Sequence, residues 1–318
     1  MEPKKKFAHI DYLKGLAAIF VVRHPALSYG HLQTSNIVIN SIYTMIIYSH
    51  VPLFLCIAGY LCHEQPLGTY YKKKVSRLLI PFVVFSLLKI AYTALIDNSH
   101  AHAAGLFSQL ADAFLTGSLY WFIYAILIMY MVAPLLWKMK KGNIAVFIGL
   151  ITVSTVLEVT DIYLSDILQI HNTVTFGCYF VGGILLQQYK HALCAFAEKR
   201  KAMLIAAASL IIVGILCFKA NYTQPMPHFL KVLLAFSMMY LLSLAAKALP
   251  ENIKPLTFIG KISLQVMLFD SFFKVILFTL IPVTMLTVWP VILINILLTC
   301  ICCVIIKKIP YVRVLFGL

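Results

Sequence analysis

The sequence predicts an all-α membrane protein with about ten transmembrane helices. Of its 318 residues, 62% are hydrophobic and the mean hydropathy is +0.92, whereas soluble domains are about 45–50% apolar. Apolar runs near the ~20 residues that a bilayer requires recur along the whole chain. They lie near residues 8–29, 37–62, 76–96, 117–137, 143–160, 172–189, 202–218, 228–247, 262–282 and 286–306.

The positive charges alternate between these runs as they do in a multi-pass membrane protein. With the N-terminus in the cytoplasm, 20 of the 26 Lys and Arg residues fall in inner segments, and only Lys219 and Lys231 fall in outer ones. Because cytoplasmic loops carry such an excess, we expect both termini inside and the 98–116 and 220–227 loops outside. The net charge of +15 then reflects orientation in the bilayer and not a nucleic-acid partner. No linker is long enough to separate domains, so residues 1–318 are predicted to form one membrane-embedded domain.

The first predicted helix carries an unusual number of ionisable residues. Asp11, Lys14, Arg23 and His24 all lie within an otherwise apolar run. Each such group at depth in a bilayer costs roughly 2.5–3.5 kcal/mol, so the four together predict a buried polar site. Pro25 is expected to disturb the helix directly after His24. The equal alternative is a histidine near the outer interface that is merely solvated.

The next two predicted helices hold further candidates at their ends. His50 precedes Pro52 at the outer entry of the second helix, and Gly59 permits close helix contact; both features are more often structural than functional. The third helix begins with YKKKVSRLLIPF, residues 71–82. Its three lysines are typical of anchoring at the inner face and at anionic lipid. Arg77 already lies in the apolar phase, where a guanidinium can bind phosphate bidentately.

Later helices offer weaker signals. Trp121 lies where an aromatic interface belt is expected, and Glu158 lies near the outer end of the fifth predicted helix, where a carboxylate is most often solvated. Asp270 and Lys274 are four residues apart, so they face one side of a helix and are expected to pair. The eight cysteines lie in or beside apolar runs without CxxC spacing, so we expect neither disulfides nor a metal site.

Taken together, these stretches resemble the bacterial multispanning acyltransferase family three, in particular its short members similar to fucose 4-O-acetylases. IDYLKG at 10–15 resembles the family's opening "(I/L)D-x-(L)-(R/K)-G", and SHVPLFLCIAGYL at 49–61 resembles its "FHMPLFFFLSGYL". Three further stretches follow in the family's order and spacing: RLLIPF at 77–82, WFIYAILIMYMVAPLL at 121–136 and GKISLQVMLF at 260–269. The resemblance covers about the whole chain.

The resemblance implies an O-acetyltransferase of the bacterial inner membrane, with acetyl-CoA as cytoplasmic donor and a cell-surface or lipid-linked sugar or polysaccharide as acceptor. It implies Lys14 and His24 as the essential pair. On this interpretation Arg77 and Lys74 hold the phosphates of CoA. The acceptor side is assigned to a set of four residues, namely His50, Arg23, Trp121 and Glu158. No metal is required.

Two departures from the family pattern concern the site. The family usually places ten residues between the cation and the histidine, but only nine separate Lys14 from His24, which leaves them about 80° apart on an ideal helix. The distortion before Pro25 or a π-bulge would realign them; otherwise Arg23 stands in for part of the pair. Asp270 occupies a place where relatives often have a histidine.

Two other functions remain open. Intramembrane charges also occur in transporters or exporters of small polar solutes or lipid-linked glycans, although the sequence shows neither an internal repeat nor paired broken helices. The other function is that of a structural partner in a polysaccharide-synthesis complex.

Overall fold

The computed structural model describes residues 8–29, 37–96, 103–196, 199–222, 226–250, 253–282, 284 and 287–318, and within them every regular element is helical. Eight helices of this described part are long and apolar enough to cross a membrane: Tyr43–Tyr60, Leu67–Ala94, Ser118–Met139, Gly142–Val159, Lys201–Lys219, His228–Ala248, Ser263–Leu280 and Val288–Lys307. The other two predicted spans form α1 (Ala8–Tyr29) and α9 (Ile170–Gln188). The predicted fold class, an all-α polytopic membrane protein, is therefore confirmed.

The chain forms two compact units. Unit 1 comprises Met1–Leu61 and Tyr179–Ile301, and unit 2 comprises Cys62–Cys178 and Cys302–Leu318. The single domain over 1–318 stays a prediction.

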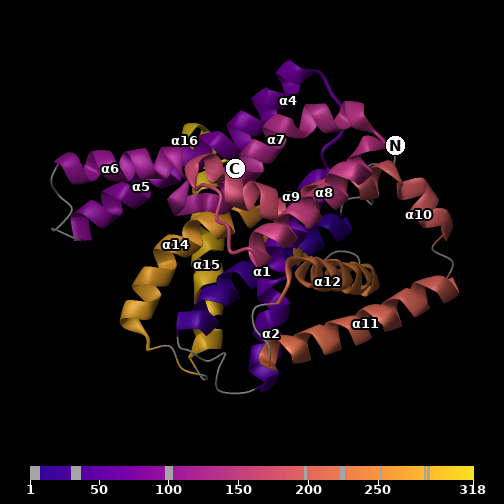
Figure 1. The fold of residues 1–318 in the computed structure, drawn as a ribbon. Helices are drawn as coiled ribbons and strands as arrows, with labels where there is room; N and C mark the ends of the chain where they lie inside the picture. The colour runs from indigo at the N-terminus through magenta and orange to yellow at the C-terminus, as the bar shows by residue number, and fades with distance from the viewer. Residues whose placement is uncertain are drawn as a thin grey trace. The chain divides into compact units, whose positions relative to one another are not determined.

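Helix α1 is the centre of unit 1 (Figure 1). It packs against α2 (Ile37–Ile47), α3 (His50–Tyr60), α12 (His228–Ala248), α13 (Lys254–Lys261) and α14 (Ser263–Leu280). The unit also holds α10 (Lys190–Phe196), α11 (Lys199–Tyr222) and most of α15 (Val288–Lys307).

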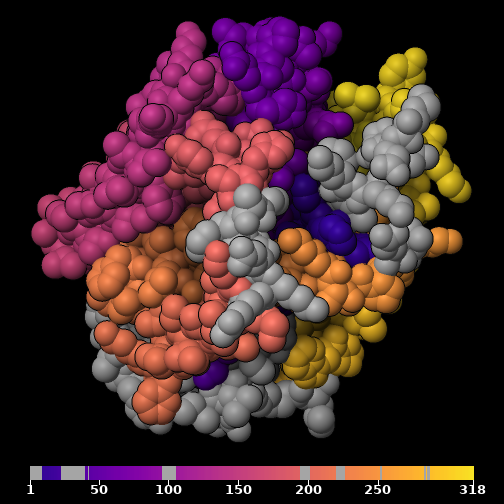
Figure 2. All heavy atoms as spheres, turned by 90° about the vertical axis from the view of Figure 1, so that its right-hand side faces the viewer, coloured from indigo at the N-terminus to yellow at the C-terminus, as the bar shows by residue number. Residues whose placement is uncertain are grey.

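Small residues allow the closest helix contacts of unit 1. A Cβ at Gly260 of α13 would overlap the backbone of Asp11 in α1, and one at Gly15 would meet Leu256. Figure 2 shows this contact, with the indigo spheres of α1 next to orange spheres of the α13 region. Gly59 of α3 likewise lies against the carbonyl oxygen of Phe180, which confirms that this glycine permits close helix contact.

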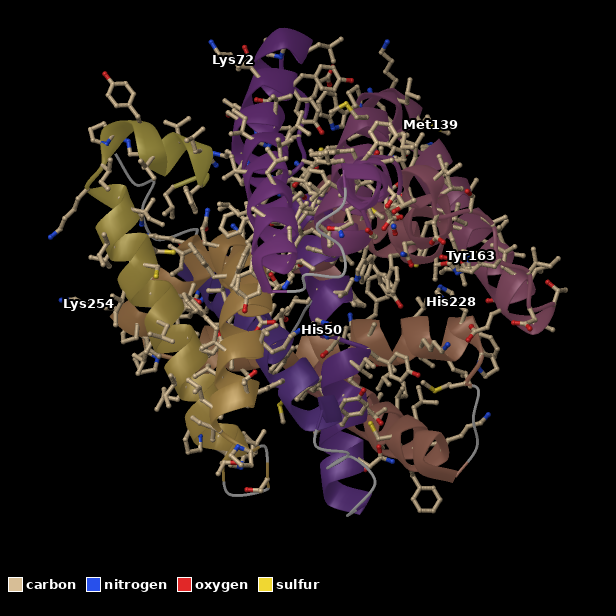
Figure 3. The ribbon with its side chains drawn as sticks, turned by 90° about the vertical axis from the view of Figure 1, so that its left-hand side faces the viewer. His50, Lys72, Met139, Tyr163, His228 and Lys254 are labelled. Carbon is tan, nitrogen blue, oxygen red and sulfur yellow. The ribbon has the colours of Figure 1, made fainter. Side chains whose placement is uncertain are left out.

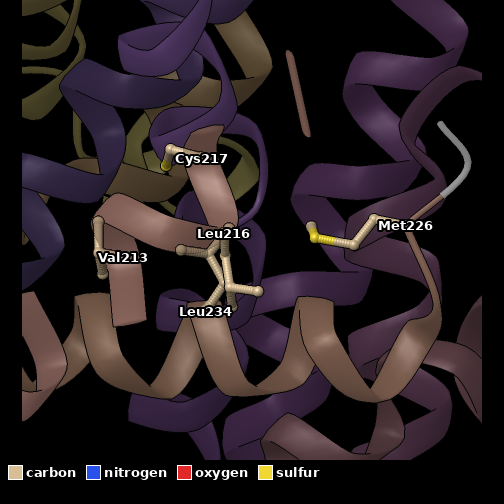
Figure 4. Packing of buried hydrophobic residues seen from close by; sticks show 5 residues of the cluster. All are labelled: Val213, Leu216, Cys217, Met226 and Leu234. Carbon is tan, nitrogen blue, oxygen red and sulfur yellow. The ribbon is translucent and has the colours of Figure 1, made fainter. Parts of the chain in front are cut away.

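A separate apolar cluster joins α11 to α12 (Figure 4). Its buried members are Val213, Leu216, Cys217, Met226 and Leu234. Their packing fixes α12, and the C-terminal end of α12 in turn meets α1.

Unit 2 begins with one long helical path, α4 (Leu67–Lys74), the π-helical turn η3 (Val75–Leu79) and α5 (Ile80–Ile96). There follow α6 (Ala103–Leu115), η5 (Ser118–Tyr120), α7 (Trp121–Met139), α8 (Gly142–Val159), η6 (Ile167–Gln169), the first half of α9, and α16 (Pro310–Leu315). Part of the predicted 98–116 loop is therefore the amphipathic helix α6. Figure 3 shows Lys72 and Met139 at one end of this unit and Tyr163 toward the other.

Candidate active site

The first turns of α1 are fixed by hydrogen bonds to the segment between α12 and α13. The hydroxyl of Tyr12 donates to the carbonyl of Pro250 and accepts from the amide of Ile253, each at 3.0 Å. This side chain is only 1% exposed. The ring of His9 bonds the carbonyl of Ala246 through Nδ1 at 3.3 Å. These bonds set the rotation of α1 and therefore the direction in which Lys14 points.

Lys14 follows Tyr12 by two residues in α1 and lies beside Asp11. Its Nζ is 4.0 Å from Oδ1 of Asp11, and the two side chains are 27% and 18% exposed. The pair lowers the cost of placing both charges in the first turns of a membrane helix. The side chain of Lys14 is therefore partly exposed beside its acidic partner.

The expected break at Pro25 is wrong. Helix α1 continues through Pro25 to Tyr29, as membrane helices often do because neighbouring groups satisfy the freed carbonyl. The described π-helical turn lies at Val75–Leu79 and not in α1. Ten regular helical steps therefore separate the backbone positions of Lys14 and His24, which leaves them about 80° apart. The side chains of Arg23 and His24 lie outside the described residues, so their predicted roles stay predictions.

His50 occupies a break between α2 and α3. Pro52 has no N–H to offer the carbonyl of Tyr48, and the regular helix is interrupted at Tyr48 and Ser49. The Nδ1 of His50 lies 2.6 Å from the carbonyl oxygen of Ile46. A carbonyl can only accept, so Nδ1 is the donor in this contact. His50 is 8% exposed and lies on the helix that packs against α1.

The basic start of unit 2 presents Arg77 on its surface. Arg77 is exposed within the π-helical turn η3, and Lys72 and Lys73 are exposed on the preceding turn. A π-helical turn holds one residue more than an α-turn and is frequent at functional sites. The guanidinium is therefore accessible to a ligand at the end of the unit that also carries Lys138.

Lys74 is placed differently from its neighbours. Its Nζ lies 3.4 Å from the centroid of the Tyr130 ring and 5.4 Å from that of Tyr70, a cation–π arrangement. The hydroxyl of Tyr70 donates to the carbonyl of Tyr130 at 3.0 Å and lies 3.4 Å from the thiol of Cys62. Burial raises the pKa of that thiol. The ammonium of Lys74 has aromatic partners here. Its predicted contact with phosphate stays a prediction.

The other end of unit 2 is built from polar loops and aromatic rings. Trp121 contacts Phe176 at 5.4 Å between ring centroids, and Glu158 is half-buried near the end of α8. The ring of Tyr163 stacks on His171 at 4.2 Å. A hydrogen bond from Tyr163 to Asp166 raises the pKa of the tyrosine. Trp121 and Glu158 were predicted from the sequence, whereas His171 was not, because no motif marks it.

A family model described as an acyltransferase domain, that of acyltransferase family 3, matches residues 7–308. The chain belongs to this family. No curated protein and no solved structure matches it at a significant level. The protein is thus a multi-pass membrane acyltransferase. The predicted acyltransferase family is confirmed, while the likeness to fucose 4-O-acetylases, the acetyl-CoA donor and the sugar acceptor stay predictions.

One expected ion pair of the acyltransferase is absent. Asp270 and Lys274 are both described, yet the structure records no ion pair between them. Asp270 instead accepts a hydrogen bond of 2.8 Å from the side-chain amide of Asn295 on α15. The spacing within α14 correctly placed both groups on one side, but the carboxylate turns toward the neighbouring helix. The sequence pattern of one helix does not reveal such a partner.

Proposed function

We propose that this acyltransferase moves an acetyl group from cytoplasmic acetyl-CoA to a hydroxyl of a cell-surface or lipid-linked sugar, in a bacterial inner membrane. The family match over residues 7–308 carries the proposal, because it establishes acyl transfer. The donor and the acceptor are inferred from the distribution of charged and polar side chains over the predicted inner and outer ends.

The donor side is assigned to the basic start of unit 2. CoA carries several phosphate groups, and arginine binds phosphate with two parallel hydrogen bonds. Arg77 is exposed there, with Lys72 and Lys73 one turn away. These charges face the predicted cytoplasmic side, where acetyl-CoA is available. Lys74 adds positive potential from its place over Tyr130.

The chemistry is assigned to α1. Lys14, whose side chain is partly exposed beside Asp11, attracts the donor and polarises the thioester carbonyl. His24 takes the proton from the sugar hydroxyl as the hydroxyl oxygen attacks the thioester carbon. The carbon–sulfur bond then breaks and a proton ends on the sulfur of CoA. A positioned general base contributes about 10²–10⁴-fold to such a step.

The acceptor side is assigned to polar and aromatic groups nearer the predicted outer face. His50 offers an imidazole ring whose Nδ1 donates to the carbonyl of Ile46, while Arg23 lies next to the proposed base in the sequence. Trp121 and Glu158 belong to unit 2; an aromatic surface and a carboxylate suit a sugar's apolar face and hydroxyls, and their role toward the acceptor stays a prediction from the sequence. The acceptor must reach the membrane, because the predicted outer segments are short.

The experiment is acetyl transfer by the purified protein in liposomes, with labelled acetyl-CoA inside and candidate glycans or lipid-linked sugars outside. The proposal expects label on the glycan, in amounts that depend on both substrates. Label that never leaves acetyl-CoA with any sugar acceptor, in protein shown to be folded, would contradict it.

A further inference from the structure

Three polar side chains are buried near the middle of two neighbouring membrane-spanning helices of unit 1. Asp270 of α14 is 5% exposed, and Asn295 and Thr299 of α15 are 3% and 0% exposed. Asn295 donates to Asp270 across the helix contact. Thr299 is four residues beyond Asn295, so both lie on the same face of α15. Figure 1 shows α14 and α15 next to one another.

This cluster has hydrogen-bonding capacity that the protein leaves unused. Oδ1 of Asn295 and Oγ1 of Thr299 are buried without a hydrogen-bond partner. A buried polar atom left in this state is unfavourable, and lipid supplies no substitute partner. A buried water typically joins two to four such groups. A water at this place would have the Asp270 carboxylate and the Asn295 amide oxygen as partners, with the Thr299 hydroxyl one turn further along α15.

The carboxylate of Asp270 interacts electrostatically with Lys274 without a direct ion pair. Lys274 lies one turn further along α14 and is half-buried, but it is not within ion-pairing distance of Asp270. An ionised carboxylate at this depth is costly, and such groups inside spans commonly serve proton relays. A buried carboxylate in contact with a water molecule can take up a proton and release it again.

Acyl transfer requires a proton to move in this part of the molecule. The carbon–oxygen bond forms, the carbon–sulfur bond breaks, and the hydroxyl proton must finally reach the sulfur of CoA. The sugar is predicted to arrive from outside and CoA from inside, so the proton crosses part of the membrane. Helix α14 packs against α1, which carries Lys14 and His24.

We propose that Asp270, with a water molecule held by Asn295 and Thr299, is the station that receives this proton from the base and returns it to the thiolate. The inference rests on the proposed function, and it assigns a role to a residue that the reaction scheme above leaves unused. It requires no reactant beyond the two substrates, because the same proton leaves oxygen and arrives at sulfur.

The test uses Asp270→Asn in the liposome assay. The new amide keeps the size of the carboxylate and can still accept from Asn295, but it cannot take a proton. We expect kcat to fall about 10²-fold, the lower end for a positioned acid–base group, with the KM for acetyl-CoA unchanged. The solvent deuterium isotope effect on kcat should increase, and Asp270→Glu should restore most of kcat. Thr299→Val, which removes one partner of the water, should cause a smaller fall.

The matched control is Thr279→Val on the same helix. The hydroxyl of Thr279 is exposed and bonds the carbonyl of Val275, so this change should leave kcat unaltered. The inference is overturned if Asp270→Asn keeps wild-type kcat, or if its kcat falls with an unchanged isotope effect and no rescue by Asp270→Glu. The inference and the proposed function both fail if the wild-type protein labels no glycan. The two failures are distinguishable because the first occurs in a protein that transfers acetyl groups.

Discussion

Removing Arg77 should weaken donor binding more than turnover. The side chain is exposed on η3, so its loss leaves no buried partner and little cost to folding. A hydrogen bond to a charged group contributes about 1.5–3 kcal/mol, and each 1.4 kcal/mol is a factor of ten. Arg77→Ala should therefore raise the KM for acetyl-CoA by about 10- to 100-fold, with kcat changed much less. Arg77→Lys keeps the charge but loses the planar guanidinium, so its KM should lie between those of the wild type and Arg77→Ala.

The assay is initial-rate acetyl transfer at varied acetyl-CoA, repeated at two ionic strengths. Arg313→Ala is the matched control, because Arg313 is also an exposed arginine of unit 2, in α16. Its KM should stay near that of the wild type. Salt should raise the wild-type KM more than that of Arg77→Ala, since salt screens exposed charges. An unchanged KM in folded Arg77→Ala protein would refute the phosphate role and leave Arg77 as a lipid anchor.

Two further predictions concern orientation and packing. Cysteines introduced at residues 138–142 should react with an impermeant thiol reagent only from the cytoplasmic side, and labelling from outside would reverse the topology. Gly260→Ala should lower the midpoint of thermal unfolding, because the new Cβ meets the backbone of Asp11 and overpacking typically costs about 1–3 kcal/mol. Gly149→Ala, at a position with open space, should not lower the midpoint. Equal midpoints for Gly260→Ala and Gly149→Ala would contradict the tight α1–α13 contact.

The helices were predictable because a bilayer imposes a long apolar run on each one, and the eight helices of the described residues that are long and apolar enough to span overlap those runs. Contacts between helices were not. The bond from Asn295 to Asp270 joins residues 25 apart, and the rings of Tyr70 and Tyr130 meet from helices 60 residues apart. No local signal in the sequence marks Asn295 as the partner of Asp270, or Tyr130 as the partner of Tyr70.

Two expectations about the geometry of α1, the break at Pro25 and the alternative π-bulge, were not met, each for its own physical reason. Proline removes one backbone hydrogen bond from a helix and commonly breaks it. In a membrane protein neighbouring groups satisfy the freed carbonyl, and α1 continues through Pro25. The π-helical turn at Val75–Leu79 follows from how one helix must fit its neighbours, which no residue type encodes. The candidate residues Lys14, His50 and Arg77 were found from the sequence because each is a polar group in an apolar run.

His24 is the residue on which the account depends most directly. Replacing a polar side chain by alanine lowers the cost of membrane insertion, so His24→Ala protein should be made and inserted normally. If His24 is the base, its acetyl transfer should fall by about 10²–10⁴-fold, while His31→Ala, seven residues further on, should keep most of its activity. Transfer from labelled acetyl-CoA by the two variants, side by side in liposomes, is the measurement. An active His24→Ala protein beside an inactive His31→Ala protein would contradict the assignment.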